Sequence, residues 1–470
     1  MRTLVWFRND LRTTDNPALY HAREQGEVVA VFLVAATQWR EHDVGDNRFA
    51  FLLDNLHELK AELDRLGIPL KLLDAPRFDD APAALLKLAR SLSVNAIAFN
   101  EEYPLNERKR DSKVRLAFES ENLKVDTWHA GAIVPPGAVL TGRGEPYTVF
   151  SPFKRKWLAS IGPEALEPLA APRRQRACDV TSDPVPTKLD GVPRDRVSEL
   201  WPGGQGEAAR RLERFCEMRI AQYKRDRDIP ALPGTSQLSP YLSVGAVSGR
   251  QCLTAAAALN EGRLDGGSVG ISSWISELVW RDFYRHVIAL FPHVSRGQSF
   301  RPELDALPWR HAPAELAAWK SGQTGYPLVD AAMRQLAETG WMHNRLRMLT
   351  AMFLSKHLLL DWRHGERYFM QQLVDGDFAA NNGGWQWSAS TGTDAAPYFR
   401  IFNPFTQAER FDHNAEFIRH WVPELRHVPV KIIVKREGER IDGYPEPIVD
   451  HKMARERAIE TFKSFQAAGK

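Results

Sequence analysis

Short runs of apolar and β-branched residues alternate with amphipathic segments over the first 130 residues. Segments with helical spacing lie between these runs, at 47–66, 79–92 and 106–121. The alternation predicts a doubly wound parallel sheet covered by helices, a Rossmann-like α/β domain over residues 1–130. The predicted strands are Thr3–Phe7, Val28–Val34, Leu70–Leu73, Ala96–Phe99 and Val125–Trp128.

The pattern changes at residue 131. Prolines punctuate polar and basic sequence as far as residue 203, with one short helical segment near Phe153–Ile161. We interpret 131–203 as an interdomain linker that few contacts cross. Strand signals nearly vanish after it, so a mainly α-helical domain is predicted over 204–470. Its clearest helical segments are Glu207–Ala221, Ser273–Phe291, Leu328–Leu336, Asn344–Leu359 and Gly365–Leu373.

Composition and charge narrow the class of protein only slightly. The chain is 43% hydrophobic and 26% charged, which is ordinary for a globular protein of two or three domains. Its net charge of +3 permits a polyanionic partner but does not require one. The cysteines, Cys178, Cys216 and Cys252, are odd in number and widely spaced, which argues against disulfides or structural zinc and favours the cytoplasm.

Targeting and phosphate-binding signals are missing from the sequence. Met1 leads directly into a strand-like run, and we find no apolar stretch long enough for a membrane span, so we expect a soluble protein. Neither a GxGxxG nor a GxxxxGK[ST] motif follows the first strand. The first domain is therefore expected to bind something other than a dinucleotide or a nucleoside triphosphate.

Eight of the fourteen tryptophans fall between Trp274 and Trp387, among polar residues rather than in a purely apolar background. Each could belong to an ordinary core. As a group they suit a flat aromatic ligand or electron hopping, because indole rings stack well and are easily oxidised.

Residues 235–240 read Thr-Ser-Gln-Leu-Ser-Pro. We predict a helix start here, with Ser239 at the cap and Pro240 at the first helical position. The free amides of such a helix end could hold an anion such as pyrophosphate, although the same residues would also serve as a simple cap.

A predicted helix carries Trp274, Glu277, Trp280, Arg281 and Arg285. The glutamate and the first arginine are four residues apart and could form an intrahelical ion pair. The sequence around them is apolar nearly all round, which indicates a buried helix whose charges need partners. A ligand could supply those partners.

Trp341, Asn344 and Met348 are spaced to share one face of a helix. An asparagine amide can pair with the edge of a base or a flavin through its donor and its acceptor. A core face would rarely contain asparagine.

Asp375 and Asp377 precede Asn381-Asn382-Gly383-Gly384 and Trp385-Gln386-Trp387. A calcium loop is excluded, because Ala379 and Gln386 stand where an EF-hand needs oxygen ligands, and no metal site is predicted. Taken alone, Asn-Asn-Gly-Gly is typical of a turn.

Together, residues 341–348, 375–377 and 381–387 resemble the flavin core of the DNA photolyase/cryptochrome family. Residues 4–12, Leu-Val-Trp-Phe-Arg-Asn-Asp-Leu-Arg, resemble that family's amino terminus, so the similarity spans essentially the whole chain. The chain most resembles bacterial class I cyclobutane pyrimidine dimer (CPD) photolyases. The resemblance implies a monomeric lyase that uses blue light and fully reduced anionic FAD to split pyrimidine dimers in DNA by electron transfer.

The resemblance implies that FAD lies in the helical domain, with Asp377 at the flavin ring edge and Asn381, also a candidate catalytic residue, beside N5. Gln237 stands where a relative has arginine, which removes one phosphate contact. The implied FAD-binding residues are Tyr223, Arg227, Thr235, Ser236, Gln237, Leu238, Ser239, Trp274, Arg281, Trp341, Arg347, Asp375, Asp377 and Asn381.

For the DNA lesion, the resemblance implies that Glu277 and Asn344 act as catalytic residues that hydrogen-bond the damaged bases. Trp280 and Trp387 would pack against the bases, and basic residues would meet the phosphates. The implied substrate-binding residues are Glu277, Trp280, Asn344, Arg345, Met348, Trp387 and Arg400.

Two further sites follow from the resemblance. Trp385, Trp362 and Trp309 match a chain of tryptophans that restores reduced flavin by electron hopping, whereas Trp319 is assigned to the core. In the first domain, His42, Asn106 and Glu107 match a site for a methenyltetrahydrofolate antenna. Ser295-Arg296 replaces a Cys-Lys pair of relatives near that antenna site.

Two alternatives lie within the family. A (6-4) photolyase would be expected to carry a second histidine at the place of Asn344. A cryptochrome photoreceptor usually adds a long carboxyl-terminal tail, whereas this sequence stops at Lys470, soon after the helix-like segment Lys452–Phe465. CPD repair is therefore the favoured function.

Overall fold

The structure is a computed structural model that describes residues 1–187, 195–435 and 440–468. Residues 188–194 of the predicted linker lie outside the described residues. Residues 436–439 and 469–470 of the predicted helical domain lie outside them as well. The chain divides into two compact units. Unit 1 contains Met1–Ala221, Ser236–Ser295 and Val374–Ala379, and unit 2 contains Gln222–Thr235, Arg296–Leu373 and Ala380–Lys470.

Unit 1 contains a five-stranded sheet in which every neighbouring pair of strands is parallel. The strand order is β3-β2-β1-β4-β5, so β1 lies between β2 and β4 at the point where the order reverses. The predicted doubly wound sheet is confirmed, and each predicted strand is correct to within one residue at either end. The strands are β1 (Arg2–Phe7), β2 (Glu27–Val34), β3 (Leu70–Asp74), β4 (Ala96–Asn100) and β5 (Lys124–Trp128).

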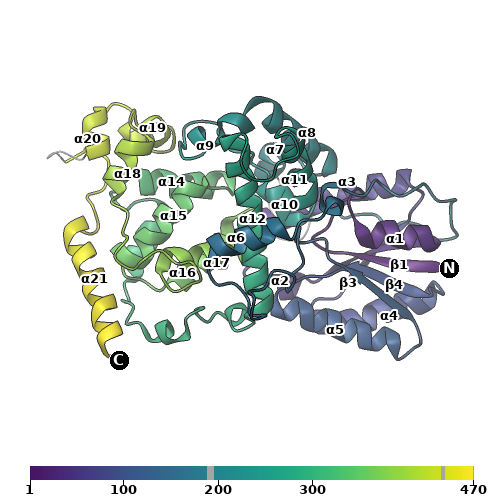
Figure 1. The fold of residues 1–470 in the computed structure, drawn as a ribbon. Helices are drawn as coiled ribbons and strands as arrows, with labels where there is room; N and C mark the ends of the chain where they lie inside the picture. The colour runs from purple at the N-terminus through teal and green to yellow at the C-terminus, as the bar shows by residue number, and fades with distance from the viewer. Residues whose placement is uncertain (188–194, 436–439, 469–470) are drawn as a thin grey trace. The chain divides into compact units, whose positions relative to one another are not determined.

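The central strands β1, β2 and β4 are buried on both faces, as near-continuous apolar strands require. Leu4 and Trp6 of β1 pack with Leu85, Val114 and Phe118, which come from the helices α4 and α5. Figure 1 shows α1 on one side of the sheet and α4 and α5 on the other. The helices that accompany the sheet are α1 (Pro17–Gln25), α2 (Ala36–Glu41), α3 (Asp46–Arg65), η1 (Phe78–Asp80), α4 (Ala81–Ser91) and α5 (Leu105–Glu119).

Part of the predicted linker runs along the edge strand β3. The Asp183 amide donates to the Leu70 carbonyl at 2.8 Å, and the Leu72 amide donates to the Asp183 carboxylate at 2.9 Å. The buried Gln175 side chain bonds both the amide and the carbonyl of Val28, each at 2.9 Å. These contacts satisfy backbone groups that an open sheet edge would expose.

The rest of unit 1 is helical and holds a long, mostly buried helix, α12, that begins at a Ser268 cap. The predicted helices near 153–161, 207–221 and 273–291 are confirmed with shifted ends. The elements are α6 (Phe150–Ala159), η2 (Pro163–Leu166), α7 (Asp195–Leu200), α8 (Gln205–Met218), α10 (Ser239–Val244), α11 (Gly249–Ala258) and α12 (Val269–Leu290).

Helices of unit 2 surround one large apolar core that includes Trp319, Trp362 and Trp385. The predicted helix at 344–359 ends as a π-helical turn, η6. The elements are α9 (Tyr223–Asp226), η5 (Pro302–Ala306), α13 (Pro313–Ser321), α14 (Pro327–Thr339), α15 (Asn344–Met352), η6 (Phe353–His357), α16 (Trp362–Gln372), α18 (Pro404–Phe411), α19 (Glu416–Trp421), η7 (Pro423–Leu425), α20 (Val430–Lys435) and α21 (His451–Ala468).

Three short elements span the joints of the two units: η3 (Ile220–Gln222), η4 (Val294–Arg296) and α17 (Phe378–Ala389). Across the described part of the chain, the helices are too short or too polar to cross a membrane.

Candidate functional site

A buried carboxylate fixes α12 to the predicted linker. Asp282 is fully buried and accepts hydrogen bonds from the amides of Ile133 and Val134 and from Trp157 Nε1, at 2.9–3.1 Å. A buried charge needs such donors. The expectation that few contacts cross 131–203 is therefore wrong for this stretch, because linker residues provide the donors.

The cations of α12 have partners of two kinds. Arg281 donates to the backbone carbonyls of Gly131 at 2.8 Å and Leu242 at 2.9 Å, and burial lowers its pKa to about 10. Arg285 forms an ion pair with Asp377, with 2.7 Å between Nη2 and Oδ2. Backbone carbonyls and one carboxylate of the protein thus supply partners that the sequence analysis had left to a ligand.

Two tryptophans of α12 pack against other aromatic rings of unit 1. Trp274 is buried against Phe215, with ring centroids 5.1 Å apart. Trp280 is part exposed and stacks face to face on Phe150, with centroids 3.6 Å apart and planes 6° apart. Phe150 was not singled out in the sequence, because it lies in the segment interpreted as a linker.

The loop before α10 contains a strained residue. Gln237 has φ +52°, in the left-handed region that non-glycine residues seldom adopt. The helix begins at Ser239, one residue earlier than predicted, so Leu238 occupies the cap position. The predicted serine cap is therefore wrong, and Pro240 lies in the first turn.

In unit 2, Arg227 and Arg345 both lie close to the Asp228 carboxylate. The Arg227 guanidinium lies 5.3 Å from the Tyr223 ring centroid. Arg345 forms an ion pair with Asp228 at 2.8 Å and lies 4.3 Å over the Phe411 ring. Asp228 thus fixes the position of Arg345.

The helix α15 begins at Asn344, with His343 as its cap. His343 Nδ1 accepts from the Arg345 amide at 3.2 Å, and burial lowers the pKa of His343 to about 4. Trp341 precedes the helix, so the predicted shared helical face is wrong for Trp341. Asn344 and Met348 do lie on α15, where Asn344 is exposed and Met348 part buried.

The segment Asn381-Asn382-Gly383-Gly384 lies inside α17, so a turn is wrong here. Asn381 Nδ2 donates to the Glu366 carbonyl at 3.0 Å, and Asn382 donates to the Glu366 carboxylate at 2.8 Å. These bonds hold α17 to α16 and offset the low helix propensity of asparagine and glycine.

The predicted hopping tryptophans share one core. Trp385 and Trp362 are buried in it, and Trp309 packs against it while staying part exposed. Trp319 is fully buried, as its assignment to the core predicts, and its centroid lies 6.0 Å from that of Trp385.

Three further predicted residues lie in unit 2: Trp387 and Arg400 of the substrate site, and Arg347 of the flavin site. Trp387 is part exposed and Arg400 is exposed. Arg347 Nε donates to the Met342 carbonyl at 2.9 Å. The sequence missed Lys356, which is fully buried and donates to the Arg400 carbonyl at 3.1 Å; burial lowers its pKa to about 7.

In the first domain, the structure brings the three predicted antenna residues together. His42 bonds Asn106 at 3.0 Å, and its other ring nitrogen lies 3.6 Å from the Glu107 carboxylate. Burial raises the pKa of Glu107 to about 7 and lowers that of His42. At neutral pH, His42 is therefore mostly uncharged, and Glu107 is close to the midpoint of its titration.

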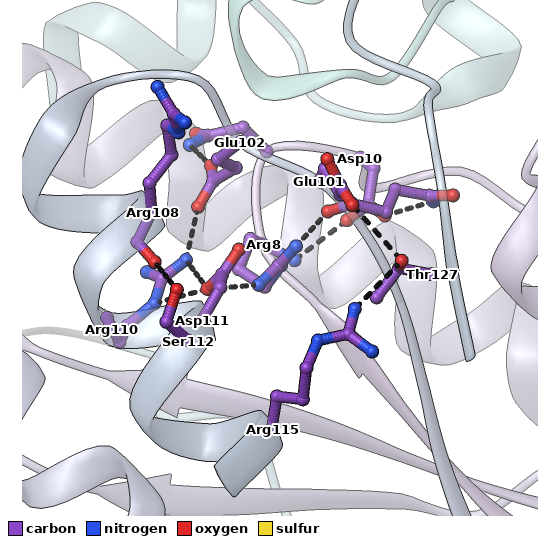
Figure 2. Close-up of polar contacts among 12 residues, drawn as sticks. Arg8, Asp10, Glu101, Glu102, Arg108, Arg110, Asp111, Ser112, Arg115 and Thr127 are labelled. Carbon is purple, nitrogen blue, oxygen red and sulfur yellow. Dashed lines mark hydrogen bonds and ion pairs between the residues drawn. The ribbon is translucent and has the colours of Figure 1, made fainter. Parts of the chain in front are cut away.

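A charged network lies beside them, at the carboxyl ends of β1 and β4. Figure 2 shows Asp111 between Arg8 and Arg110, at 3.1 and 2.7 Å, and Glu102 against Arg110 at 2.7 Å. Arg8 also lies 4.4 Å over the Trp6 ring. The position where the strand order reverses could have indicated these residues, because ligands of such sheets bind there.

Comparisons with known proteins match both ends of the chain. A family model described as "DNA photolyase" matches residues 3–173, and one described as "FAD binding domain of DNA photolyase" matches residues 274–464. The chain is 44% identical to a deoxyribodipyrimidine photo-lyase of Escherichia coli, over 99% of both chains. It is 39% identical to one of Neurospora crassa, over 97% of this chain and 81% of the relative.

Solved structures agree. A bacterial class III photolyase from Agrobacterium tumefaciens has a TM-score of 0.90 at 35% identity, over 99% of this chain and 98% of the other. A cryptochrome from Synechocystis has a TM-score of 0.84 at 26% identity, over 98% and 99%. The chain therefore belongs to the DNA photolyase/cryptochrome family, among its class I CPD photolyases.

Proposed function

We propose that this chain repairs cyclobutane pyrimidine dimers in DNA, as a deoxyribodipyrimidine photo-lyase. Full-length similarity to enzymes of that name carries the proposal. When bound, fully reduced FAD excited by blue light supplies the electron that opens the dimer into two pyrimidines and takes it back afterwards. The residues of the chain bind and orient the flavin and the damaged bases, and they exclude water from the site.

The donors present fit FAD. Arginines such as Arg281 and Arg227 are suited to a pyrophosphate. Nη1 of Arg285 is buried and has no hydrogen-bond partner among the described residues, although Nη2 of the same group holds Asp377. A carbonyl oxygen of an isoalloxazine would satisfy this donor.

We assign the FAD site to the residues matched by the family motifs. Hydroxyls and arginines would hold the phosphates, and aspartates and an amide would hold the flavin edge. The proposed residues are Tyr223, Arg227, Thr235, Ser236, Gln237, Leu238, Ser239, Trp274, Arg281, Trp341, Arg347, Asp375, Asp377 and Asn381.

For the lesion, Glu277 and Asn344 would hydrogen-bond the two bases, and Trp280 and Trp387 would pack against them. Extruding the bases costs a few kcal/mol and costs least for a damaged, poorly stacked pair. Arg345 and Arg400 would meet phosphates, with Met348 against the dimer. Asp228 supports this role for Arg345, because it fixes the guanidinium.

Trp385, Trp362 and Trp309 would carry an electron from the surface to oxidised flavin. Their common apolar core supports the proposal. An antenna folate, methenyltetrahydrofolate, would bind at His42, Asn106 and Glu107, whose mutual contacts support a single site.

The remaining assignments are an α/β antenna domain over 1–130, a linker over 131–203 and a helical FAD- and DNA-binding domain over 204–470. We further propose a monomer of the cytoplasm. Gel filtration with light scattering tests the oligomeric state, and a mass near 53.3 kDa is expected.

The proposed activity is tested with two damaged oligonucleotides, one with a CPD and one with a (6-4) photoproduct. Chemically reduced holoprotein under blue light should restore the first and leave the second unchanged. Repair of the (6-4) lesion alone would contradict the proposal, and repair of neither would favour a cryptochrome-type photoreceptor.

A further inference from the structure

We propose that Phe150 is a positioning residue that holds the Trp280 ring ready to stack on an extruded pyrimidine dimer. The inference rests on the proposed function, which assigns that stacking to Trp280. It gives the helix α6, in the predicted linker, a part in recognising the lesion that acts through Trp280.

The apolar side of α6 faces α12. Phe150, Phe153 and Trp157 are buried and follow the spacing of one helical face. Phe150 stacks on Trp280, Phe153 packs on Phe283 with centroids 5.1 Å apart, and Trp157 donates to Asp282 at 2.9 Å. Three successive contacts thus fix α6 along α12.

The Phe150 contact differs from the other two in its geometry. Its centroids are 3.6 Å apart and its planes 6° apart, so the rings overlap almost completely. Aromatic quadrupoles prefer an offset or edge-on arrangement. The overlap must therefore be held by the packing around Phe150, which is 9% exposed.

The overlap with Phe150 restricts the motion of the Trp280 ring, which is the ring proposed to stack on a damaged base. Trp280 is part exposed, and an exposed indole exchanges rotamers unless its surroundings hold it. One face of the ring lies flat on Phe150, which fixes its plane. A base that stacks on Trp280 then pays less ordering entropy than it would on a mobile ring.

The test is a matched pair of substitutions on one helix, Phe150→Leu and Phe153→Leu. Both remove one ring from α6, but only the first removes the flat support of Trp280. Dissociation constants of the holoprotein are measured for an oligonucleotide with a CPD and for its undamaged counterpart, with FAD content and thermal midpoint recorded for each variant.

We expect Phe150→Leu to weaken binding of the CPD oligonucleotide about three- to ten-fold and to leave undamaged DNA unaffected, in line with the value of an aromatic pair. Phe150→Tyr, which keeps a flat ring at this position, should bind the CPD oligonucleotide as tightly as the wild type. Phe153→Leu should lower the thermal midpoint without changing the ratio of the two constants. If Phe150→Leu loses FAD, Phe150→Met, which keeps the volume without the flat ring, gives the same comparison.

Trp280→Leu separates this inference from the proposed function. If Trp280→Leu weakens CPD binding and the Phe150 variants do not, the positioning role is overturned while the proposed function stands. If Trp280→Leu binds the CPD as tightly as the wild type, the stacking role of Trp280 fails, and the inference fails with it.

Discussion

The surroundings of single charged side chains in this protein come from residues far apart in the sequence. Arg285 forms an ion pair with Asp377. Glu107 lies in a buried setting that raises its pKa to about 7. The first pair joins residues 92 positions apart, which no sequence pattern could have indicated. The role of Asp377 was predictable only from the family motif.

Glu277→Gln should lower repair yield while FAD stays bound. A hydrogen bond between a charged group and a base is worth about 1.5–3 kcal/mol, so binding or repair should fall about ten-fold or more. Single-turnover repair and FAD content are the measurements. Glu213→Gln, an exposed glutamate on α8, is the control and should behave as the wild type. Loss of FAD from Glu277→Gln would give that residue a structural role instead.

Trp385→Phe should block light-driven reduction of oxidised flavin but spare repair by chemically reduced protein, because hopping requires an oxidisable ring close to the flavin. Transient absorption after a flash measures the first step. Trp319→Phe is the matched control, since Trp319 packs on Trp385 but is assigned to the core. Equal loss of photoreduction and repair in Trp385→Phe would rule out the hopping role.

Glu107 makes the stability of the folate-free protein depend on pH. Its pKa is about 4.5 when unfolded and about 7 when folded, so the folded state binds the proton more tightly. The contribution of Glu107 to stability is therefore fully present below pH 4.5 and is lost as pH rises to about 7. Glu107→Gln should therefore raise the urea midpoint at pH 8 relative to the wild type and leave it unchanged at pH 4.5. An equal effect at both pH values would contradict the raised pKa.

At the level of elements, sequence pattern and structure agree where burial is regular. The central strands β1, β2 and β4 are buried on both faces, and short β-branched and apolar runs located them and the two edge strands. The pattern failed for α17, where Asn381-Asn382-Gly383-Gly384 favours a turn but contacts with Glu366 hold a helix. For α6 the pattern located the helix at 153–161, whereas it spans Phe150–Ala159, so the residue that stacks on Trp280 was missed.

Gly365 lies at a close contact between α16 and α17. A Cβ at this position of α16 would overlap the Trp385 ring. Gly365→Ala should therefore lower the thermal midpoint and impair photoreduction, because Trp385 must move. Overpacking of this kind typically costs about 1–3 kcal/mol.

The control for Gly365→Ala is Gly206→Ala, on α8. Its Cβ would meet only Arg210 Nη1, at an ordinary 3.7 Å. This variant should be as stable as the wild type or more stable by about 0.5–1 kcal/mol. Similar midpoints for the two variants would show that Gly365 leaves room for a side chain.

For the whole molecule, composition and a net charge of +3 indicated neither the cofactor nor the lesion. The chemistry depends on separate groups in the sequence, which the family motifs identify and the comparisons support. Since the electron returns after each repair, the protein acts without net oxidation or reduction. The roles proposed for Glu277 and Asn344 depend on that cycle.

The most direct test of this cycle is repair of a CPD oligonucleotide by holoprotein with fully reduced FAD, measured together with the flavin spectrum before and after illumination. Blue light should split many dimers per protein and leave the flavin reduced, with no repair in the dark. Dimers that stay intact in the light, or flavin that is oxidised once for every dimer split, would contradict the account.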